Sequence, residues 1–208
     1  MSLHIWLAHD ISFQPTTQEP CLYLLKSKEF NEDVYLLRQV DDFTIAYSNA
    51  ETAEHYWKAI DSHFKANLKH ECLLTRHNGI DIIQSATTFK IHCGTYINKI
   101  LQPKLTLLVP PATGNKPIPM KTDNAYIHKL DTSTGPETST EAQILEQKMG
   151  FKYCAATGEL IFAMITCRSD ISNAVLKLTQ SNNKPVEIHY KAILDIYWYL
   201  QATPTKEM

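Results

Sequence analysis

Long apolar runs are absent from this sequence of 208 residues, although 44% of its residues are hydrophobic. The apolar residues fall in short runs, whereas a membrane-spanning helix needs about 20 consecutive apolar residues. A basic stretch followed by an apolar one, which would mark a secretory signal peptide, does not open the chain. We therefore expect an intracellular protein, cytoplasmic or nuclear, with no transmembrane segment and no membrane partner.

Close pairs of cysteines are missing as well. The chain has five cysteines at scattered positions, namely Cys21, Cys72, Cys93, Cys154 and Cys167. An odd, unpaired set is typical of buried thiols in a reducing compartment and does not predict a disulfide framework. His70 and Cys72 lie close together, but no second pair follows at zinc-finger spacing, so no structural zinc site is expected.

An excess of charge of one sign is also lacking. The 20 basic and 22 acidic residues leave a net charge of −2. A strong nucleic-acid binder usually carries a clear basic excess. Any surface of this chain that binds nucleic acid is therefore expected to be a local stripe of basic residues.

Two adjacent aspartates, Asp41 and Asp42, stand between two strand-like runs. The flanking residues 34–40 and 43–47 are rich in the β-branched and aromatic residues that favour strands. The pattern predicts a hairpin with both carboxylates at its tip. At an effective dielectric of about 20, two like charges about 4 Å apart repel by roughly 4 kcal/mol, which water or cations must relieve.

The spacing of the two aspartates leaves two interpretations open. Aspartate is a common turn residue because it hydrogen-bonds its own backbone, so the pair fits a solvated turn. A pair of divalent cations would also relieve the repulsion. Two-metal sites of this kind hold the attacking and leaving oxygens of phosphoryl transfer.

The first part of the chain, residues 1–102, has an α+β pattern. Residues 20–26 read as a strand, and the aspartate hairpin follows. A serine with a glutamate three residues later, beginning at Ser48, is a capping-box signature for a helix. Residues 78–93 predict a second hairpin, and a short helix begins at Thr95. This order of elements is not a repeat of strand, helix and strand.

The rest of the chain divides into a connecting strap and a helical unit. Residues 103–149 hold six of the ten prolines and show no periodicity, which predicts an irregular strap. In residues 150–208, an apolar run predicts a buried helix, Asp170 can cap a second helix, and a third begins after Pro185. The apolar stripes of these helices are interpreted as core packing.

The run Leu-Leu-Arg-Gln-Val-Asp-Asp-Phe at residues 36–43 resembles the metal-binding motif of copia-type LTR retrotransposon reverse transcriptases. Four further blocks resemble the same family in the same order. They are Glu-Pro-Cys-Leu-Tyr at 19–23, Asn-Gly-Ile-Asp-Ile at 78–82, the Gly-Glu-Leu and Thr-Cys-Arg-Ser-Asp-Ile segments within 158–171, and His-Tyr-Lys-Ala with Tyr-Leu within 189–200. The resemblance thus spans residues 19–200.

The resemblance implies part of a right-hand polymerase that copies RNA into DNA. Its partners would be an RNA template, a DNA primer and deoxynucleoside triphosphates. Asp41 and Asp42 would be catalytic and would bind two Mg²⁺ ions, with Asp41 the main ligand. Gln39 and Val40 would face the primer terminus or the incoming nucleotide, and Gly79 would support the primer end.

The same resemblance implies contacts to the nucleic-acid backbone from the helical unit. The candidates are Arg168, Lys177 and Lys191. An ion pair between Arg168 and Asp170 is an equally good interpretation of that arginine.

The chain also departs from the family pattern. Nothing before Glu19 resembles the fingers or the earlier palm strand that supplies a third carboxylate, and Asp10 lacks the flanking pattern. Ser169 replaces the usual proline, and no RNase H domain follows. We therefore expect a partial palm (1–102), a strap (103–149) and a thumb-like unit (150–208), cut from a polyprotein. Such a fragment would be inactive alone. The alternative is a non-catalytic remnant that binds nucleic acid or protein.

Overall fold

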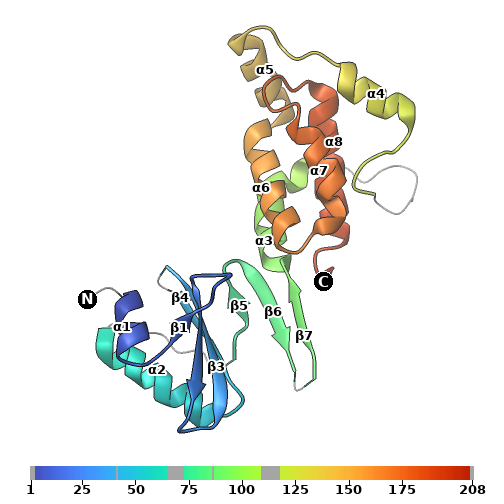
Figure 1. The fold of residues 1–208 in the computed structure, drawn as a ribbon. Helices are drawn as coiled ribbons and strands as arrows, with labels where there is room; N and C mark the ends of the chain where they lie inside the picture. Colours follow the sequence, from blue (N-terminus) through green and yellow to red (C-terminus); the bar gives the residue numbers. More distant parts are fainter. Residues whose placement is uncertain (1–2, 41, 65–72, 86, 109–117, 207–208) are drawn as a thin grey trace. The chain divides into compact units, whose positions relative to one another are not determined.

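The structure is a computed structural model that describes residues 3–40, 42–64, 73–85, 87–108 and 118–206 (Figure 1). The predicted α+β class is confirmed, since these residues form two antiparallel sheets and eight α-helices. The chain divides into two compact units, Met1–Leu73 and Leu74–Met208. Within the described ranges, none of the helices combines the length and apolar character needed to cross a bilayer.

The first unit contains a four-stranded antiparallel sheet in which neighbouring strands follow one another along the chain. The strands are β1 (Gln14–Pro15), β2 (Leu22–Ser27), β3 (Glu32–Gln39) and β4 (Asp42–Ala46). Helix α1 (Leu3–His9) precedes the sheet, and α2 (Ala50–Phe64) follows it.

One face of this sheet packs against the two helices. Side chains alternate between the two faces of a strand, and Tyr23 and Leu25 of β2 are buried with Val34 and Leu36 of β3. Ile60 of α2 is buried in the same cluster. Full burial of such a side chain contributes roughly 1.5–3 kcal/mol, so this contact fixes α2 on one side of the sheet.

The second unit begins with a three-stranded sheet and continues as a helical bundle. The strands are β5 (Arg76–His77), β6 (Ile80–Gln84) and β7 (Phe89–His92). The helical elements are α3 (Gly94–Leu101), η1 (Gln102–Leu107), α4 (Asn124–Thr132), α5 (Ser139–Met149), α6 (Tyr153–Thr166), η2 (Ser169–Ile171), α7 (Ser172–Thr179) and α8 (Glu187–Ala202). The predicted second hairpin is confirmed by the antiparallel pairing of β6 with β7.

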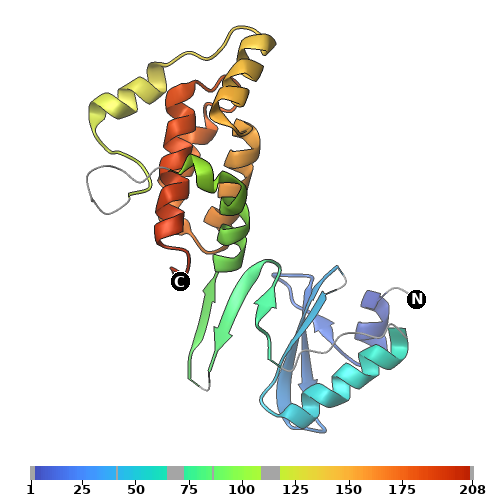
Figure 2. The ribbon, with the colours of Figure 1, turned by 180° about the vertical axis from the view of Figure 1, so that it is seen from behind.

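Helices α3, α6, α7 and α8 lie side by side around one apolar core (Figures 1 and 2). The three helices predicted after residue 150 are therefore present. One expectation is wrong, because α6 is not buried all round: Ile165 is 68% exposed, and a Cβ built on Gly158 would meet nothing within 4 Å. Because the sequence of α6 is apolar at almost every position, it does not indicate which face is exposed.

The predicted cap of the second helix is also wrong. Asp170 lies in η2, and α7 begins after Ile171 without a side-chain cap. The Asp170 carboxylate accepts hydrogen bonds from the Arg168 guanidinium instead. This bidentate, charge-assisted contact is stronger than a capping hydrogen bond, so the Asp170 carboxylate does not cap α7.

The strap predicted from its prolines is largely helical where the structure describes it. Helix α4 is capped by Asp123, whose carboxylate accepts a hydrogen bond of 2.8 Å from the Tyr126 N–H. Helix α5 begins with a capping box between Thr138 and Glu141. Such caps satisfy N–H groups that a helix start leaves unpaired, and they stabilise helices whose periodicity is weak. The predicted boundary at 102/103 falls where α3 runs directly into η1.

Candidate functional site

The aspartate hairpin is present in the first unit. Strands β3 and β4 pair in antiparallel register with Gln39 opposite Asp42, so two residues separate the paired positions. Asp42 is the first residue of β4 and is exposed. Asp41, the expected main metal ligand, lies outside the described residues.

Gln39 and Asp42 occupy the face of the sheet that does not pack against α1 and α2. The register places Leu37 opposite Thr44, and strand alternation puts Gln39 and Asp42 on the same face as this pair. Tyr35, on the same face, is 43% exposed. We name this surface the open face; it ends in Gln39 and Asp42 at the hairpin turn.

Val40 adopts an unusual backbone conformation in this turn. Its φ is +57°, in the left-handed region that β-branched residues rarely enter. Its side chain is 86% exposed, so no buried packing offsets the cost. Such strain costs on the order of 1–3 kcal/mol and is concentrated at functional sites. The strain therefore marks this turn as a candidate site independently of the aspartates.

The described carboxylates at this end do not form a metal site by themselves. The Arg38 N–H donates to the Cys21 carbonyl at 2.9 Å, which brings Glu19 toward the same end of the sheet as Asp42. Glu19 accepts a hydrogen bond of 3.0 Å from the Cys21 N–H. Among described residues there is no group of three or more His, Cys, Asp or Glu that could hold a metal ion. Magnesium at Asp41 and Asp42 therefore stays an expectation from the resemblance.

Gly79 has a local role in the second unit, whereas Gln39, Val40 and Asp42 belong to the first. It joins β5 to β6 in a two-residue turn in which Asn78 and Gly79 have φ values of +49° and +80°. An Asn-Gly pair is favoured in such turns because both positions need positive φ. A Cβ at Gly79 would also lie 3.3 Å from Cζ of Phe162 on α6.

Arg168 is fully buried rather than available at the surface. Its guanidinium donates to both carboxylate oxygens of Asp170, at 3.0 and 3.1 Å. It also donates to the carbonyl and the hydroxyl of Thr203, both at 2.7 Å. The structure therefore shows the ion pair with Asp170 that was the alternative interpretation of this arginine, while the contact of Arg168 with a nucleic-acid backbone stays a prediction.

The two predicted lysines lie on different helices, and each has an acidic partner. Lys177 of α7 pairs with Asp131 at the end of α4. Lys191 of α8 pairs with Glu187 one turn earlier, and its side chain is 64% exposed. An exposed pair of this kind contributes only about 0–1 kcal/mol, so Lys191 can exchange its partner at little cost.

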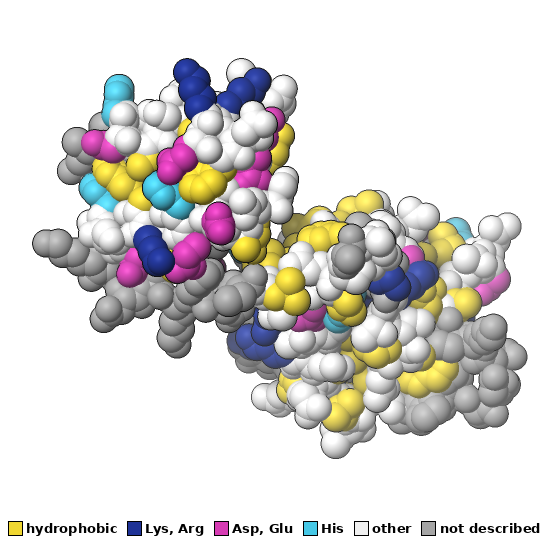
Figure 3. Space-filling view, turned by 90° about the horizontal axis from the view of Figure 1, so that it is seen from below, with side chains coloured by type: hydrophobic (Ala, Val, Ile, Leu, Met, Phe, Trp, Pro, Cys, Tyr) yellow, Lys and Arg dark blue, Asp and Glu magenta, His cyan; other side chains and the backbone are white. Residues whose placement is uncertain are grey.

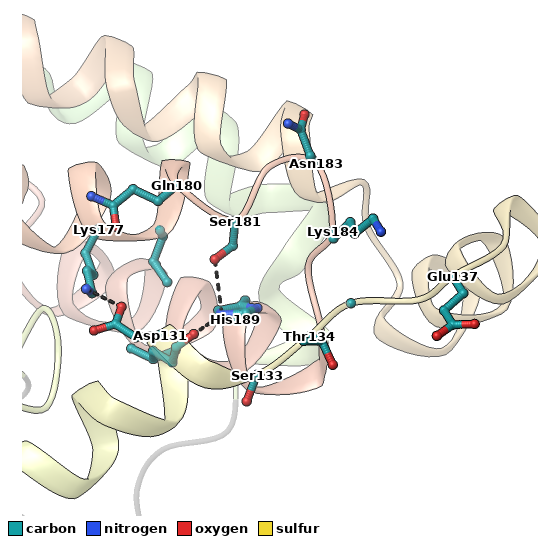
Figure 4. A pocket seen from close by; sticks show the side chains of 13 residues that line it. Asp131, Ser133, Thr134, Glu137, Lys177, Gln180, Ser181, Asn183, Lys184 and His189 are labelled. Carbon is teal, nitrogen blue, oxygen red and sulfur yellow. Dashed lines mark hydrogen bonds and ion pairs between the residues drawn. The ribbon is translucent and has the colours of Figure 1, made fainter.

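A pocket of about 530 Å³ lies where α4 ends, α7 ends and α8 begins (Figure 4). Its lining is mainly polar, with the Lys177–Asp131 ion pair at one side and His189 at its base. The sequence did not reveal this site, because the partners of His189 lie 8 and 59 residues away.

Ser181 and His189 lie 3.2 Å apart in the pocket, which invites comparison with a nucleophile and its base. His189 Nδ1 accepts a hydrogen bond of 3.0 Å from the Val186 N–H. The proton of the neutral ring is therefore on Nε2, which donates to the Leu130 carbonyl at 2.9 Å. A general base needs a free nitrogen facing the serine, so this pair is structural.

Comparison with known proteins adds no family assignment. The chain matches no family model, no curated protein and no solved structure. The resemblance to reverse transcriptases therefore rests on the five sequence blocks and enters only as a proposal.

Replacing Val40 with asparagine is expected to stabilise the first unit by about 1 kcal/mol. Asparagine enters the left-handed region at lower cost, and the exposed valine side chain contributes little packing. The free energy of unfolding in urea measures the effect. Val40→Ala is the control, since alanine keeps the Cβ that crowds this conformation. An unchanged or lower stability of Val40→Asn would contradict the assigned strain.

The Asp170 carboxylate is expected to make the free energy of unfolding depend on pH in the acidic range. Partial burial alone would raise the pKa of Asp170, but hydrogen bonds from Arg168 and Tyr199 and the Arg168 charge hold this pKa well below its usual range. A depressed folded-state pKa gives stability that is present above the unfolded pKa of about 4 and is lost as pH falls further.

Asp170→Asn should therefore lower stability at pH 7 and flatten the loss as pH falls from about 4 toward about 2. Urea midpoints measured across this range check the prediction. Asp123→Asn is the matched control, because asparagine caps a helix as well as aspartate does. Parallel pH curves for wild type and Asp170→Asn would be the contrary result.

Proposed function

We propose that this chain is a fragment of a copia-type retrotransposon reverse transcriptase, comprising the rear of the palm and the thumb. In this proposal it engages an RNA–DNA duplex but does not synthesise DNA alone. The observation that carries the proposal is the two-residue gap between Gln39 and Asp42, at the end of the open face of an antiparallel sheet.

The first unit supports the palm part of the proposal. A sheet with helices on one face and an open opposite face can receive the end of a duplex. The turn at Val40 is exposed, as is Asp42, and its strain fits a functional turn. Magnesium at Asp41 and Asp42 would activate the primer 3′-hydroxyl and neutralise the triphosphate.

The outer side of α6 supports the thumb part. Ala155, Gly158 and Ile165 are exposed on this side, and Phe162 is half-buried between them. These positions recur at helical spacing and carry no charge, and we name them the uncharged α6 face. A-form duplexes present a wide, shallow minor groove that proteins recognise mainly by shape. A smooth, uncharged face suits that groove better than it suits phosphates.

The charges of the chain limit how tightly it can hold nucleic acid. In the view of Figure 3, Lys and Arg side chains lie among Asp and Glu side chains. Lys177 and Lys191 are each paired with a carboxylate. Affinity for nucleic acid rises with the number of phosphates neutralised. We therefore infer moderate affinity with a shallow dependence on salt.

A second candidate is a non-catalytic remnant that binds a protein partner. The interspersed charges and the uncharged α6 face favour it, because protein interfaces combine an apolar centre with a mixed polar rim. Binding to nucleic acid distinguishes the two candidates.

The purified chain is expected to show no primer extension with Mg²⁺, an RNA template and a DNA primer. The reason is the missing third carboxylate, since two metals normally share ligands from two strands. Incorporation of labelled nucleotides measures activity, with a complete reverse transcriptase as the positive control. The prediction would be contradicted if the wild type incorporated nucleotides in a magnesium-dependent way and Asp41→Ala abolished this incorporation.

Gly158→Glu is expected to weaken binding to an RNA–DNA hybrid by about tenfold, equivalent to about 1.4 kcal/mol. The substitution adds a carboxylate to the uncharged α6 face, where a Cβ on residue 158 meets nothing within 4 Å. A filter-binding titration at several salt concentrations measures the change.

Two controls separate the surface from general effects of charge. Gly158→Ala adds no charge, and Ile144→Glu adds one on α5, where Ile144 is 60% exposed. Both should bind like the wild type. Equal weakening by Ile144→Glu would contradict the role of α6, and no salt-sensitive binding at all would favour the protein-binding candidate.

A further inference from the structure

Two of the cysteines lie in the same apolar core of the second unit. Cys93 is the N-cap residue of α3, directly after β7, and Cys167 is the C-cap residue of α6. Both are buried in the same apolar cluster, Cys93 completely and Cys167 with 3% of its surface exposed. The scattered spacing of the cysteines in the sequence gave no sign of this pair.

Contacts with one short segment bring residues next to the two caps together, independently of the sulfurs. A Cβ at Gly94, next to Cys93, would lie 3.3 Å from the Pro204 carbonyl oxygen. Arg168, next to Cys167, donates to the carbonyl of Thr203. Both caps therefore lie against the same short segment after α8. Each thiol also lies close enough to the other to influence its pKa.

We propose that Cys93 and Cys167 form a reversible disulfide when the protein meets a low-molecular-weight disulfide such as oxidised glutathione. The Cys167 thiolate attacks one glutathione sulfur and expels the other as a thiolate, which takes up a proton. The Cys93 thiolate then attacks the Cys167 sulfur and expels the second glutathione. Two protein thiols are oxidised to one disulfide, and one glutathione disulfide is reduced to two thiols.

The reaction is favourable but slow in the folded protein. Two thiols held in one core cluster have a high effective concentration toward each other, which stabilises the closed disulfide. Burial raises the pKa of the Cys93 thiol to about 11 and also raises that of Cys167. Few thiolates exist at neutral pH, so the disulfide forms during prolonged exposure to an oxidant and not during a brief one.

The disulfide would join parts of the second unit that are distant in sequence. Cys93 directly follows the hairpin of β6 and β7, and Cys167 ends α6. The link would close a loop that contains α3, α4, α5 and α6, and it would limit the freedom of the unfolded chain. This inference does not depend on the proposed function.

The test uses the full 208-residue chain in glutathione buffers of increasing oxidised fraction, held until the products stop changing. Free thiols are then alkylated, and tryptic peptides are analysed by mass spectrometry without reduction. Cys93 falls in peptide 91–99, whereas Cys154 and Cys167 share peptide 153–168. The Cys154→Ser background therefore makes the link to Cys167 unambiguous.

A linked pair of peptides 91–99 and 153–168 is expected in the folded Cys154→Ser protein, and Cys93→Ser should abolish it. The oxidised form should melt roughly 10 °C above the reduced form. Its rate of formation should rise about tenfold for each pH unit between 7 and 9.

Three results would overturn the proposal. One is the absence of the linked peptides in every buffer, and another is a dominant link to Cys21 or Cys72. The third is a link that forms only after the protein is unfolded in urea, because the native contact would then contribute nothing.

Discussion

The buried guanidinium of Arg168 is the interaction on which the second unit depends. Burying a charge is costly unless every donor finds a partner, and here Asp170 and Thr203 supply those partners. The contact ties the turn after α6 to the segment after α8. Removing one partner of such a buried pair typically costs about 3–5 kcal/mol, because the other charge stays buried. The arrangement of the helices therefore rests on a polar contact inside an apolar core.

Local patterns in the sequence predicted the elements that form through interactions between residues close in sequence. The alternation around Asp42 specified the hairpin of β3 and β4, and the Asn-Gly pair at Gly79 fits the turn before β6. The prolines of residues 103–149 predict an irregular strap, whereas the capping box of Thr138 and Glu141 starts a helix within it. Helix periodicity also could not show that Gly158 faces open space, since residues 160–165 are apolar on all sides of the helix.

Contacts across long stretches of sequence could not be predicted. His189 reaches the Leu130 carbonyl 59 residues away, and Arg168 reaches Thr203 across 35 residues. Both side chains look like ordinary surface residues in the sequence. Only the packing of the helices shows that Arg168 links the turn after α6 to the segment after α8. The same packing shows that His189 is a fixed hydrogen-bond donor. The candidate site thus divides into a hairpin that local rules describe and a helical unit that they do not.

The two-residue turn of β3 and β4 has a consequence for how the aspartate pair can change over time. Strand side chains alternate with a period of two, so loss or gain of one residue in the turn would invert the whole of β4. Phe43 and Ile45 would then leave the core that they share with α2. Folding alone therefore preserves the length of this turn. The aspartate pair therefore keeps its position in the hairpin through the packing of β4, whether or not it has a chemical role.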